Sequence, residues 1–433
     1  MYGIEVRNRQ KDSFQLYIGV VLQSVLAKYE GIIMIRRVFN ELSQFCFTYV
    51  DGNEGWFVGD KYTALFKFDI SDCSIKKIVK IAEEELIQDR RYWKLVKIHN
   101  KIILIPCKHN KIGILNTDNH NFRYIYVNDN FSECTSYIVY NGWIYLIGDS
   151  GIFIFDSDLE KVIECIPIPD SVKPLSAVAI FKEGHILVPL AQEAKILDFN
   201  ISDKSFFVVD LACKIKGFMA GVLEGSDIWL AGCDGDIVRW NYESKKEIIY
   251  NKFPNDFKTF DYDIDGNYMG WNKGWGKGIC NKYWPDSFVV DDKIWFIPFL
   301  SDCLLYIDKR ENMIQKYIFE KEEETKESFE AHSFVKFLFI GIYDDRYIKI
   351  FSVKRDIIYS IDVKTLEYTE EIFDISEIDT EKMINEFYRE VLKKGIFENR
   401  NIRIEDVFYL DDIKKMDENS IHSLIGRQIY QQI

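Results

Sequence analysis

The sequence predicts an all-β fold in which seven four-stranded sheets form a ring, and three observations support this. Aromatic residues make up 15% of the 433 residues, and such side chains favour strands. One phrase recurs: an apolar run ending in Gly or Pro, a short gap, and a second apolar run ending in Asp or Asn. The first five copies lie 40 to 47 residues apart, which is the spacing of the blades of a β-propeller, and the last two steps, of 67 and 54 residues, contain insertions.

The residue that ends each phrase is the most regular feature of the repeat. It is Asp or Asn in every copy, and the residue before it is always apolar. A short side chain with an oxygen acceptor suits the start of a turn, because it accepts hydrogen bonds from nearby backbone N–H groups. We therefore expect the turn between the third and fourth strands to begin at these positions: Asp69, Asn116, Asp156, Asn200, Asn241, Asp308 and Asp362.

These repeats place the propeller at residues 44–375. We expect seven blades, within a range of six to eight. A β-sandwich or two separate all-β domains is the alternative, but neither explains a repeated phrase. Residues 1–43 are expected to be a closing segment with a helix over 14–27, and residues 376–433 a helical extension. The stretch 14–27 has an export signal as its alternative and is too short and polar to span a membrane.

The repeat also resembles that of a known group of proteins. Phrases such as IFDSDLEKVIECIPIPD, at residues 154–170, resemble the blades of bacterial kelch-like and quinoprotein-like propellers. The Gly-Gly pair of kelch repeats and the Gly-His and Trp-Asp pairs of WD repeats are absent. The resemblance therefore implies the fold and no specific family, and it transfers no catalytic residue.

Charge and cysteine usage restrict the partners and the compartment. The formal net charge is −14 and no long basic run occurs, so a nucleic acid is not an expected partner. The nine cysteines are scattered and contain no C-x-x-C pair, which argues against structural zinc. An odd, scattered set of thiols is typical of a reducing compartment, so the sequence predicts a cytoplasmic protein.

Three insertions lengthen the chain between the fourth strand of one blade and the first strand of the next. They span residues 83–93, 254–285 and 320–331, and the last of these is expected to be a solvated charged segment. In an up-and-down blade these connections emerge on the same face as the loops between the second and third strands. Loops on a rigid scaffold commonly carry function, so this face is the predicted binding surface.

The insert 254–285 is the most distinctive part of that face. It combines aromatic residues with several glycines, a composition suited to stacking on sugars or anchoring a peptide or protein. The alternative is a lid that packs its own aromatic residues. Aromatic residues of the first insertion and two loop aspartates complete the predicted ligand-binding set: Trp271, Trp275, Tyr283, Trp284, Tyr92, Trp93, Asp149 and Asp302.

A short acidic pattern in the same insert suggests a metal. Asp261, Asp263 and Asp265 alternate before Gly266, as at the start of an EF-hand calcium loop. The twelfth position is Asn272 rather than the bidentate Glu of that motif. The sequence therefore predicts no required cofactor, with calcium as the one candidate and a solvated acidic turn as the alternative.

No nucleophile motif, phosphate-binding loop or histidine metal motif occurs in the sequence. We therefore expect a non-catalytic binding propeller whose aromatic face holds a carbohydrate, peptide or protein. The alternative is a hydrolase or lyase that acts on a glycan or small metabolite with carboxylates at the channel mouth. A third hypothesis is an assembly subunit that docks through the amphipathic stretch 381–432.

Overall fold

A computed structural model describes residues 48–376 with gaps, together with residues 379, 382, 383 and 386. The gaps are 60–62, 82–91, 107–109, 129–130, 132–133, 149, 174, 234–235, 256, 258, 263–267, 273–285, 299–300, 302, 321, 323–336, 354 and 356. The predicted helices at 14–27 and over most of 381–432 therefore lie outside the described residues.

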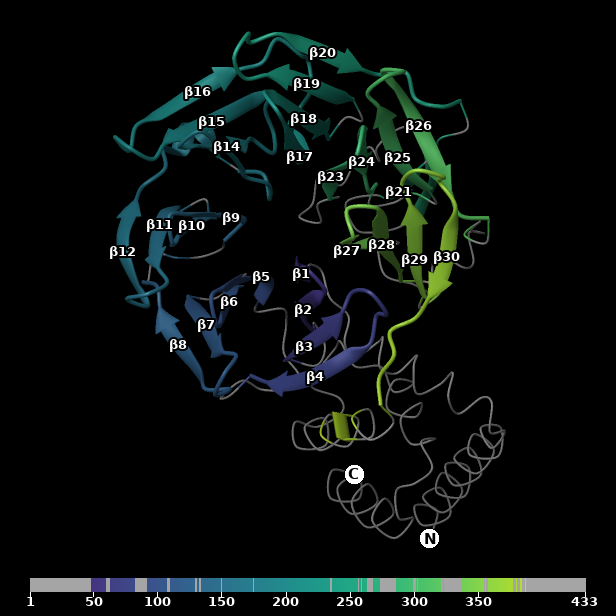
Figure 1. The fold of residues 1–433 in the computed structure, drawn as a ribbon. Helices are drawn as coiled ribbons and strands as arrows, with labels where there is room; N and C mark the ends of the chain where they lie inside the picture. Colours follow the sequence, from purple (N-terminus) through teal and green to yellow (C-terminus); the bar gives the residue numbers. More distant parts are fainter. Residues whose placement is uncertain are drawn as a thin grey trace, which may run out of the picture. The chain divides into compact units, whose positions relative to one another are not determined.

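The described residues form seven four-stranded antiparallel sheets, which confirms the predicted seven-bladed propeller (Figure 1). Each sheet takes its four strands in chain order, so no blade combines strands from the two ends of the chain. Blade 1 contains β1 (Thr48–Asp51), β2 (Glu54–Val58), β3 (Ala64–Asp69) and β4 (Ile75–Lys80). Blade 2 contains β5 (Tyr92–Ile98), β6 (Lys101–Pro106), β7 (Lys111–Asn116) and β8 (Phe122–Tyr126).

The remaining blades follow the same order along the chain. Blade 3 contains β9 (Ser136–Tyr140), β10 (Trp143–Gly148), β11 (Gly151–Asp156) and β12 (Lys161–Ile166). Blade 4 contains β13 (Ile180–Lys182), β14 (His185–Pro189), β15 (Lys195–Asn200) and β16 (Phe206–Asp210). Blade 5 contains β17 (Phe218–Glu224), β18 (Asp227–Gly232), β19 (Ile237–Asn241) and β20 (Glu247–Tyr250).

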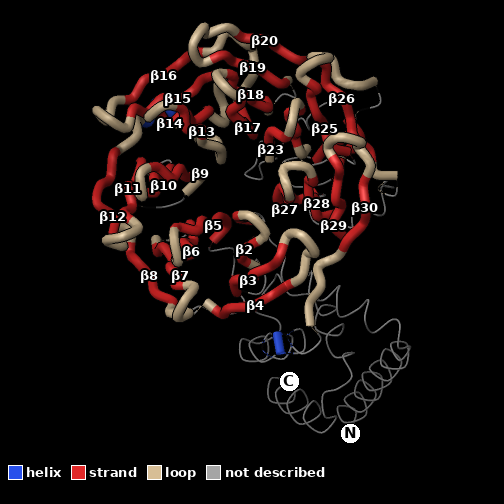
Figure 2. Tube along the Cα trace, in the orientation of Figure 1, coloured by secondary structure: helices blue, strands red, loops and turns tan. Residues whose placement is uncertain are grey.

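Blade 6 contains β23 (Ser287–Val290), β24 (Lys293–Phe296), β25 (Cys303–Asp308) and β26 (Met313–Ile318). Blade 7 contains β27 (Phe337–Tyr343), β28 (Tyr347–Ser352), β29 (Ile357–Asp362) and β30 (Tyr368–Glu371). A short 3-10 helix, Asp170–Val172, joins blades 3 and 4. Strands and short loops account for nearly all of the described chain (Figure 2).

The chain divides into two compact units. The smaller unit holds Val58–Asp89, which includes β3 and β4, and the two terminal stretches Met1–Phe45 and Phe373–Ile433. Within it, the Phe373 ring packs edge-on against Phe68, and Asp374 O accepts a hydrogen bond from Ile75 N at 2.6 Å. The larger unit holds Cys46–Phe57 and Arg90–Ile372, and so contains the first strand of every blade.

The second and third strands of the blades are buried on both faces. In β6 and β14, for example, every residue after the first is buried, so the side chains that point to opposite faces are all covered. The covering atoms come from neighbouring blades: one apolar cluster joins blades 2 and 3, another joins blades 4 and 5, and a third joins blades 6 and 7. Stacking of blades is therefore what buries the apolar core.

The predicted turn between third and fourth strands is present in all seven blades. Each closing Asp or Asn accepts a hydrogen bond on its Oδ1 atom from a backbone N–H two or three residues on, at 2.8 or 2.9 Å. The residue four positions on is left-handed in every blade, with φ between 50° and 60°. These seven residues are Cys73, His120, Glu160, Lys204, Lys245, Asn312 and Leu366.

The insertions fall where the sequence placed them, but their contents differ from expectation. The long insert contains a hairpin, β21 (Thr259–Tyr262) with β22 (Tyr268–Asn272), where only a loop was predicted. The first insertion is shorter than predicted, because Tyr92 and Trp93 already belong to β5. In the third insertion, Glu322 is fully buried and accepts hydrogen bonds from Ser352 Oγ at 2.6 Å and Tyr359 OH at 2.8 Å. The prediction that this whole segment is solvated was therefore wrong at Glu322.

The turn geometry gives a first testable prediction. Asn200→Ala removes the Oδ1 acceptor of Ser202 N and Ser202 Oγ, and should lower the free energy of unfolding by about 1 kcal/mol. Asn200→Asp is the matched control, because aspartate fills the same position in blades 1, 3, 6 and 7 and should leave stability nearly unchanged. Urea unfolding followed by tryptophan fluorescence measures both. Equal destabilisation by the two variants would contradict the turn assignment.

Candidate functional site

A cavity of about 270 Å³ lies among the first strands of the blades, within the larger unit. Strands β1, β5, β9, β17 and β23 contribute to its wall, together with Ala177, Val178 and Ala179 just before β13. Figure 1 shows these first strands at the inner side of their sheets. The volume is close to the lower end of the range of about 300–1,000 Å³ found for small-molecule pockets.

Lys94 of β5 supplies the positive charge of the cavity. Its ammonium group donates a hydrogen bond to Ala177 O at 2.8 Å and a longer one to Thr135 O at 3.5 Å. The Ala177 carbonyl is accessible because β13 is only three residues long and begins at Ile180. Burial lowers the pKa of Lys94 below its usual range, and the nearby Asp286 opposes this shift.

Asp286 supplies the negative charge. It immediately precedes β23, and among the described residues its carboxyl group has no hydrogen-bond or ion-pair partner, although Lys94 is close enough to influence it. Burial raises the pKa of Asp286 to about 6, and the Lys94 ammonium only partly offsets this. An ionised carboxylate here therefore destabilises the folded protein at neutral pH, and groups of this kind are concentrated in functional sites.

Residues of several other strands form the rest of the wall. Ser287 lines the cavity beside Asp286, and its Oγ atom is buried without a hydrogen-bond partner in the protein. Tyr137 OH donates to Leu95 O at 3.1 Å, and Thr48 Oγ1 donates to Ile340 O, so these two hydroxyls join neighbouring first strands. The segment 177–179 and Met219, Ala220 and Gly221 of β17 also line the cavity.

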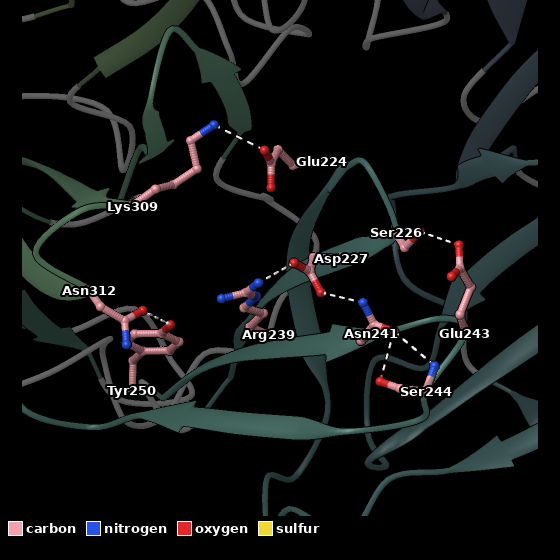
Figure 3. A network of polar contacts seen from close by, with 10 residues as sticks. All are labelled: Glu224, Ser226, Asp227, Arg239, Asn241, Glu243, Ser244, Tyr250, Lys309 and Asn312. Carbon is pink, nitrogen blue, oxygen red and sulfur yellow. Dashed lines mark hydrogen bonds and ion pairs between the residues drawn. The ribbon is translucent and has the colours of Figure 1, made fainter.

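A second polar cluster lies where blades 5 and 6 meet, and Figure 3 shows its residues. Asp227, the first residue of β18, accepts hydrogen bonds from Arg239 and, at 2.8 Å, from Asn241 Nδ2. Lys309 of blade 6 pairs with Glu224 of blade 5 at 2.9 Å. Each charged group in this cluster has a partner in the protein, so the cluster joins strands and blades and offers less to a ligand than the cavity does.

The structure describes few of the residues predicted for ligand binding. Tyr92 is the first residue of β5 and only 2% exposed, so its predicted place on an exposed loop was wrong. Trp93 follows it in the same strand, and Trp271 lies in β22 opposite Phe260. The other members of the set lie outside the described residues and stay predictions: Trp275, Tyr283, Trp284, Asp149 and Asp302.

The calcium prediction has only one described member. Asp261 belongs to β21, opposite Gly270, whereas Asp263 and Asp265 lie outside the described residues. Within the described part of the chain, no group of His, Cys, Asp or Glu side chains is arranged to hold a metal ion. None of the helices in that part is long and apolar enough to cross a membrane.

Sequence reasoning missed the two charged residues of the cavity. The sequence analysis singled out neither Lys94 nor Asp286. No local signal marks these two positions, because charged residues also occur in other first strands, as Lys182 and Glu224 do. Only ring closure shows that residues 94 and 286 reach the same cavity.

Comparison with known proteins shows the fold and no family. No protein-family model matches the chain, and no curated protein matches it in sequence. Virginiamycin B lyase from Staphylococcus aureus superimposes with a TM-score of 0.51 at 11% identity, over 73% of this chain and 94% of that chain. A catalytically inactive variant of that lyase with quinupristin gives a TM-score of 0.50 at 12% identity, over 73% and 94% of the two chains.

A third similar structure is PorZ, a bacterial surface component of the type-IX secretion system of Porphyromonas gingivalis. It gives a TM-score of 0.50 at 10% identity and covers 78% of this chain but only 39% of PorZ. Identities this low show the common fold alone. The chain thus shares its fold with proteins of different functions, and no activity transfers from them.

The raised pKa of Asp286 gives the second prediction. Because its pKa is about 6 in the folded protein against 3.8 for an unperturbed aspartate, the folded state holds this proton more tightly than the unfolded state. The contribution of the neutral Asp286 carboxyl group to the free energy of unfolding is fully present below about pH 4. This contribution is lost as the pH rises through about 6. Asp286→Asn should therefore raise the free energy of unfolding at pH 8, by on the order of 1–3 kcal/mol.

Urea unfolding at pH 4 and pH 8 measures this difference. At pH 4 the variant and the parent protein should have nearly equal stability. Asp210→Asn, at an exposed position of β16, is the control and should have little effect at either pH. A variant Asp286→Asn that is less stable than the parent at pH 8 would show that the carboxylate is held by favourable contacts, against the assignment made here.

Proposed function

We propose that this protein is a non-catalytic binding propeller that holds a small polar ligand in the cavity among its first strands. The observation that carries the proposal is the pair of opposite charges, Lys94 and Asp286, on the wall of one cavity. Burial raises the pKa of Asp286, and among the described residues its carboxyl group has no hydrogen-bond or ion-pair partner. A ligand that donates hydrogen bonds to this carboxyl group supplies such an interaction.

The long insert is next to the cavity in the sequence, because Asp286 directly follows the insert 254–285. We keep the aromatic residues of this insert as proposed contacts for the part of a ligand that extends beyond the cavity. Carbohydrate, peptide and protein ligands on that face, a cytoplasmic location and docking through 381–432 remain proposals.

An enzymatic function is the second candidate, and one observation favours it. A carboxyl group with a pKa of about 6 is suited to donate and accept protons near neutral pH. Under this alternative, Asp286 is the general acid or base of a lyase or hydrolase. Asp286→Asn would then bind its substrate without converting it, whereas under the binding proposal the parent protein also leaves its ligand unchanged.

A ligand screen tests the proposal. The full chain is heated with small monocarboxylates, primary amines and α-amino acids, and the melting temperature is recorded for each compound. A compound present at a hundred times its dissociation constant should stabilise the protein by about 2.7 kcal/mol, which is readily seen as a shift in melting temperature. We expect at least one of the three classes to give such a shift, because each can contact Lys94, Asp286 or both.

Two variants test whether the shift in melting temperature arises from binding in the cavity. Ala179→Phe fills the cavity from the segment before β13 and should abolish the shift. Val208→Phe introduces the same side chain on the outer strand β16, where Val208 is 44% exposed, and should leave the shift unchanged. The proposal fails if no class produces a shift, or if the Ala179→Phe variant responds as the parent protein does.

A further inference from the structure

We infer that the ligand of the cavity is a small hydroxylated primary amine, whose ammonium group binds the carboxylate of Asp286. This inference rests on the proposed function, because it names the ligand class of the same site. The arrangement behind it is a carboxyl group without a partner among the described residues, in a polar cavity whose Lys, Tyr and Thr side chains already donate to backbone carbonyls.

The carboxyl group of Asp286 is an acceptor that a ligand can serve. Asp286 lines the cavity, and within the described part of the chain this group has no hydrogen-bond or ion-pair partner. A buried carboxylate is stabilised by a group of opposite charge that also donates hydrogen bonds. A primary ammonium group meets both requirements, because it carries a positive charge and three N–H donors and has no acceptor.

Side-chain donors of the cavity already have acceptors in the protein. Lys94 Nζ, Tyr137 OH and Thr48 Oγ1 each donate a hydrogen bond to a backbone carbonyl of a neighbouring segment. The hydroxyl groups of Tyr137 and Thr48 have one proton each, so they can only accept a further hydrogen bond from a ligand. These contacts favour a ligand that is rich in donors over a carboxylate, which can only accept.

The positive charge of Lys94 has two consequences for the ligand. It opposes the effect of burial on Asp286, whose pKa is about 6, so the Asp286 carboxyl group is mostly ionised at neutral pH. It also repels other cations, and we therefore expect the ligand to carry a single ammonium group rather than several.

The polar wall determines the rest of the ligand. Most of the surface that lines the cavity is polar. Each first strand at the wall pairs with a second strand on one side, and its inner edge has no strand partner among the described residues. A hydroxyl group both donates and accepts, so it can bond to an N–H or a C=O group of such an edge. The volume of about 270 Å³ limits the ligand to a short chain or one ring.

Three matched pairs of compounds test the ammonium group. They are ethanolamine with ethylene glycol, serinol with glycerol, and D-glucosamine with D-glucose, and within each pair a hydroxyl group replaces the amine. Binding to the full chain at pH 7 is measured by isothermal titration calorimetry. At least one amine should bind, about tenfold or more tightly than its alcohol, because only the amine forms a charge-assisted hydrogen bond with Asp286. If no amine binds, or if each alcohol binds as tightly as its amine, the inference is overturned.

Two further comparisons test the hydroxyl groups and the number of charges. Ethylamine, isopropylamine and cyclohexylamine lack the hydroxyl groups of the three amines and should bind severalfold more weakly than their counterparts. 1,3-Diaminopropane should bind no more tightly than 3-aminopropan-1-ol, because Lys94 repels the second positive charge. An amine without hydroxyl groups that binds as tightly as its counterpart, or a diamine that binds more tightly than the amino alcohol, would contradict the ligand class inferred here.

One variant assigns the ammonium group to its partner. Asp286→Asn should weaken the amine about tenfold or more and leave its alcohol unchanged, so the difference within each pair should disappear. Asp210→Asn removes a carboxylate at an exposed position of β16 and is the control, which should change neither compound. Melting temperatures without ligand show whether both variants are folded. If Asp286→Asn leaves the amine unchanged, or weakens both compounds equally, the inference is overturned.

The pH dependence of binding gives an independent readout. Ionisation of Asp286 creates the acceptor, so the affinity for an aliphatic amine should rise about tenfold between pH 5 and pH 7.5, a range in which the amine stays protonated. The affinity of Asp286→Asn should not change over this range. A rise that persists in Asp286→Asn would show that Lys94 or Tyr137, the other titratable groups of the wall, governs binding, and would overturn the inference.

The wider ligand screen distinguishes failure of the inference from failure of the proposed function. If carboxylates or α-amino acids shift the melting temperature and amines do not, the inference is overturned while the proposed function stands. If none of these classes produces a shift, the proposed function falls together with the inference.

Discussion

The structure depends on one constraint: the second and third strands of each blade are apolar on both faces. A single sheet of this kind leaves both apolar faces in water, and a stack of two sheets still leaves the two outer faces exposed. Apolar clusters that join blades 2 and 3, 3 and 4, 4 and 5, 5 and 6, and 6 and 7 show how the chain meets this demand. Each of these clusters covers an apolar face of the two blades that it joins.

The same constraint determines where polar groups can be placed. A charged side chain between two blades would have to be buried in an apolar layer. Asp227 shows how such a charge is accommodated, because it accepts a hydrogen bond from Arg239. The first strands differ because one edge of each faces the middle of the ring rather than another strand. Lys94 and Asp286 lie at this inner edge, where they line a cavity and a ligand or water can reach them.

Much of the fold follows from the sequence, because the repeat carries its information locally. A turn that starts at Asn116 or Asp308 is specified within five residues, by a side-chain acceptor and a left-handed residue four positions on. Such patterns need no knowledge of distant parts of the chain. The seven blades, their four strands and the positions of the insertions could therefore be predicted.

The candidate site could not be predicted in the same way. Residues 94 and 286 are far apart in the sequence, and their common cavity arises only when the ring closes. Local patterns also misplaced Tyr92, since an aromatic residue beside a charged insertion resembles a loop residue until its strand partner Pro106 is known. Glu322 was misjudged for a related reason: its acidic neighbours suggest solvent, whereas Ser352 and Tyr359, on distant strands, provide a buried site for its carboxylate.

The construction of each blade from four consecutive strands has an evolutionary consequence. Each described four-stranded sheet is built from consecutive strands, and β27 of blade 7 packs on β1 of blade 1, where Thr48 donates hydrogen bonds to backbone carbonyls of β27. Duplication or deletion of one repeat length of the gene would thus add or remove a complete sheet and leave no half-sheet behind. Propellers of this kind can change their number of blades in single genetic steps, limited only by the angle at which neighbouring sheets pack.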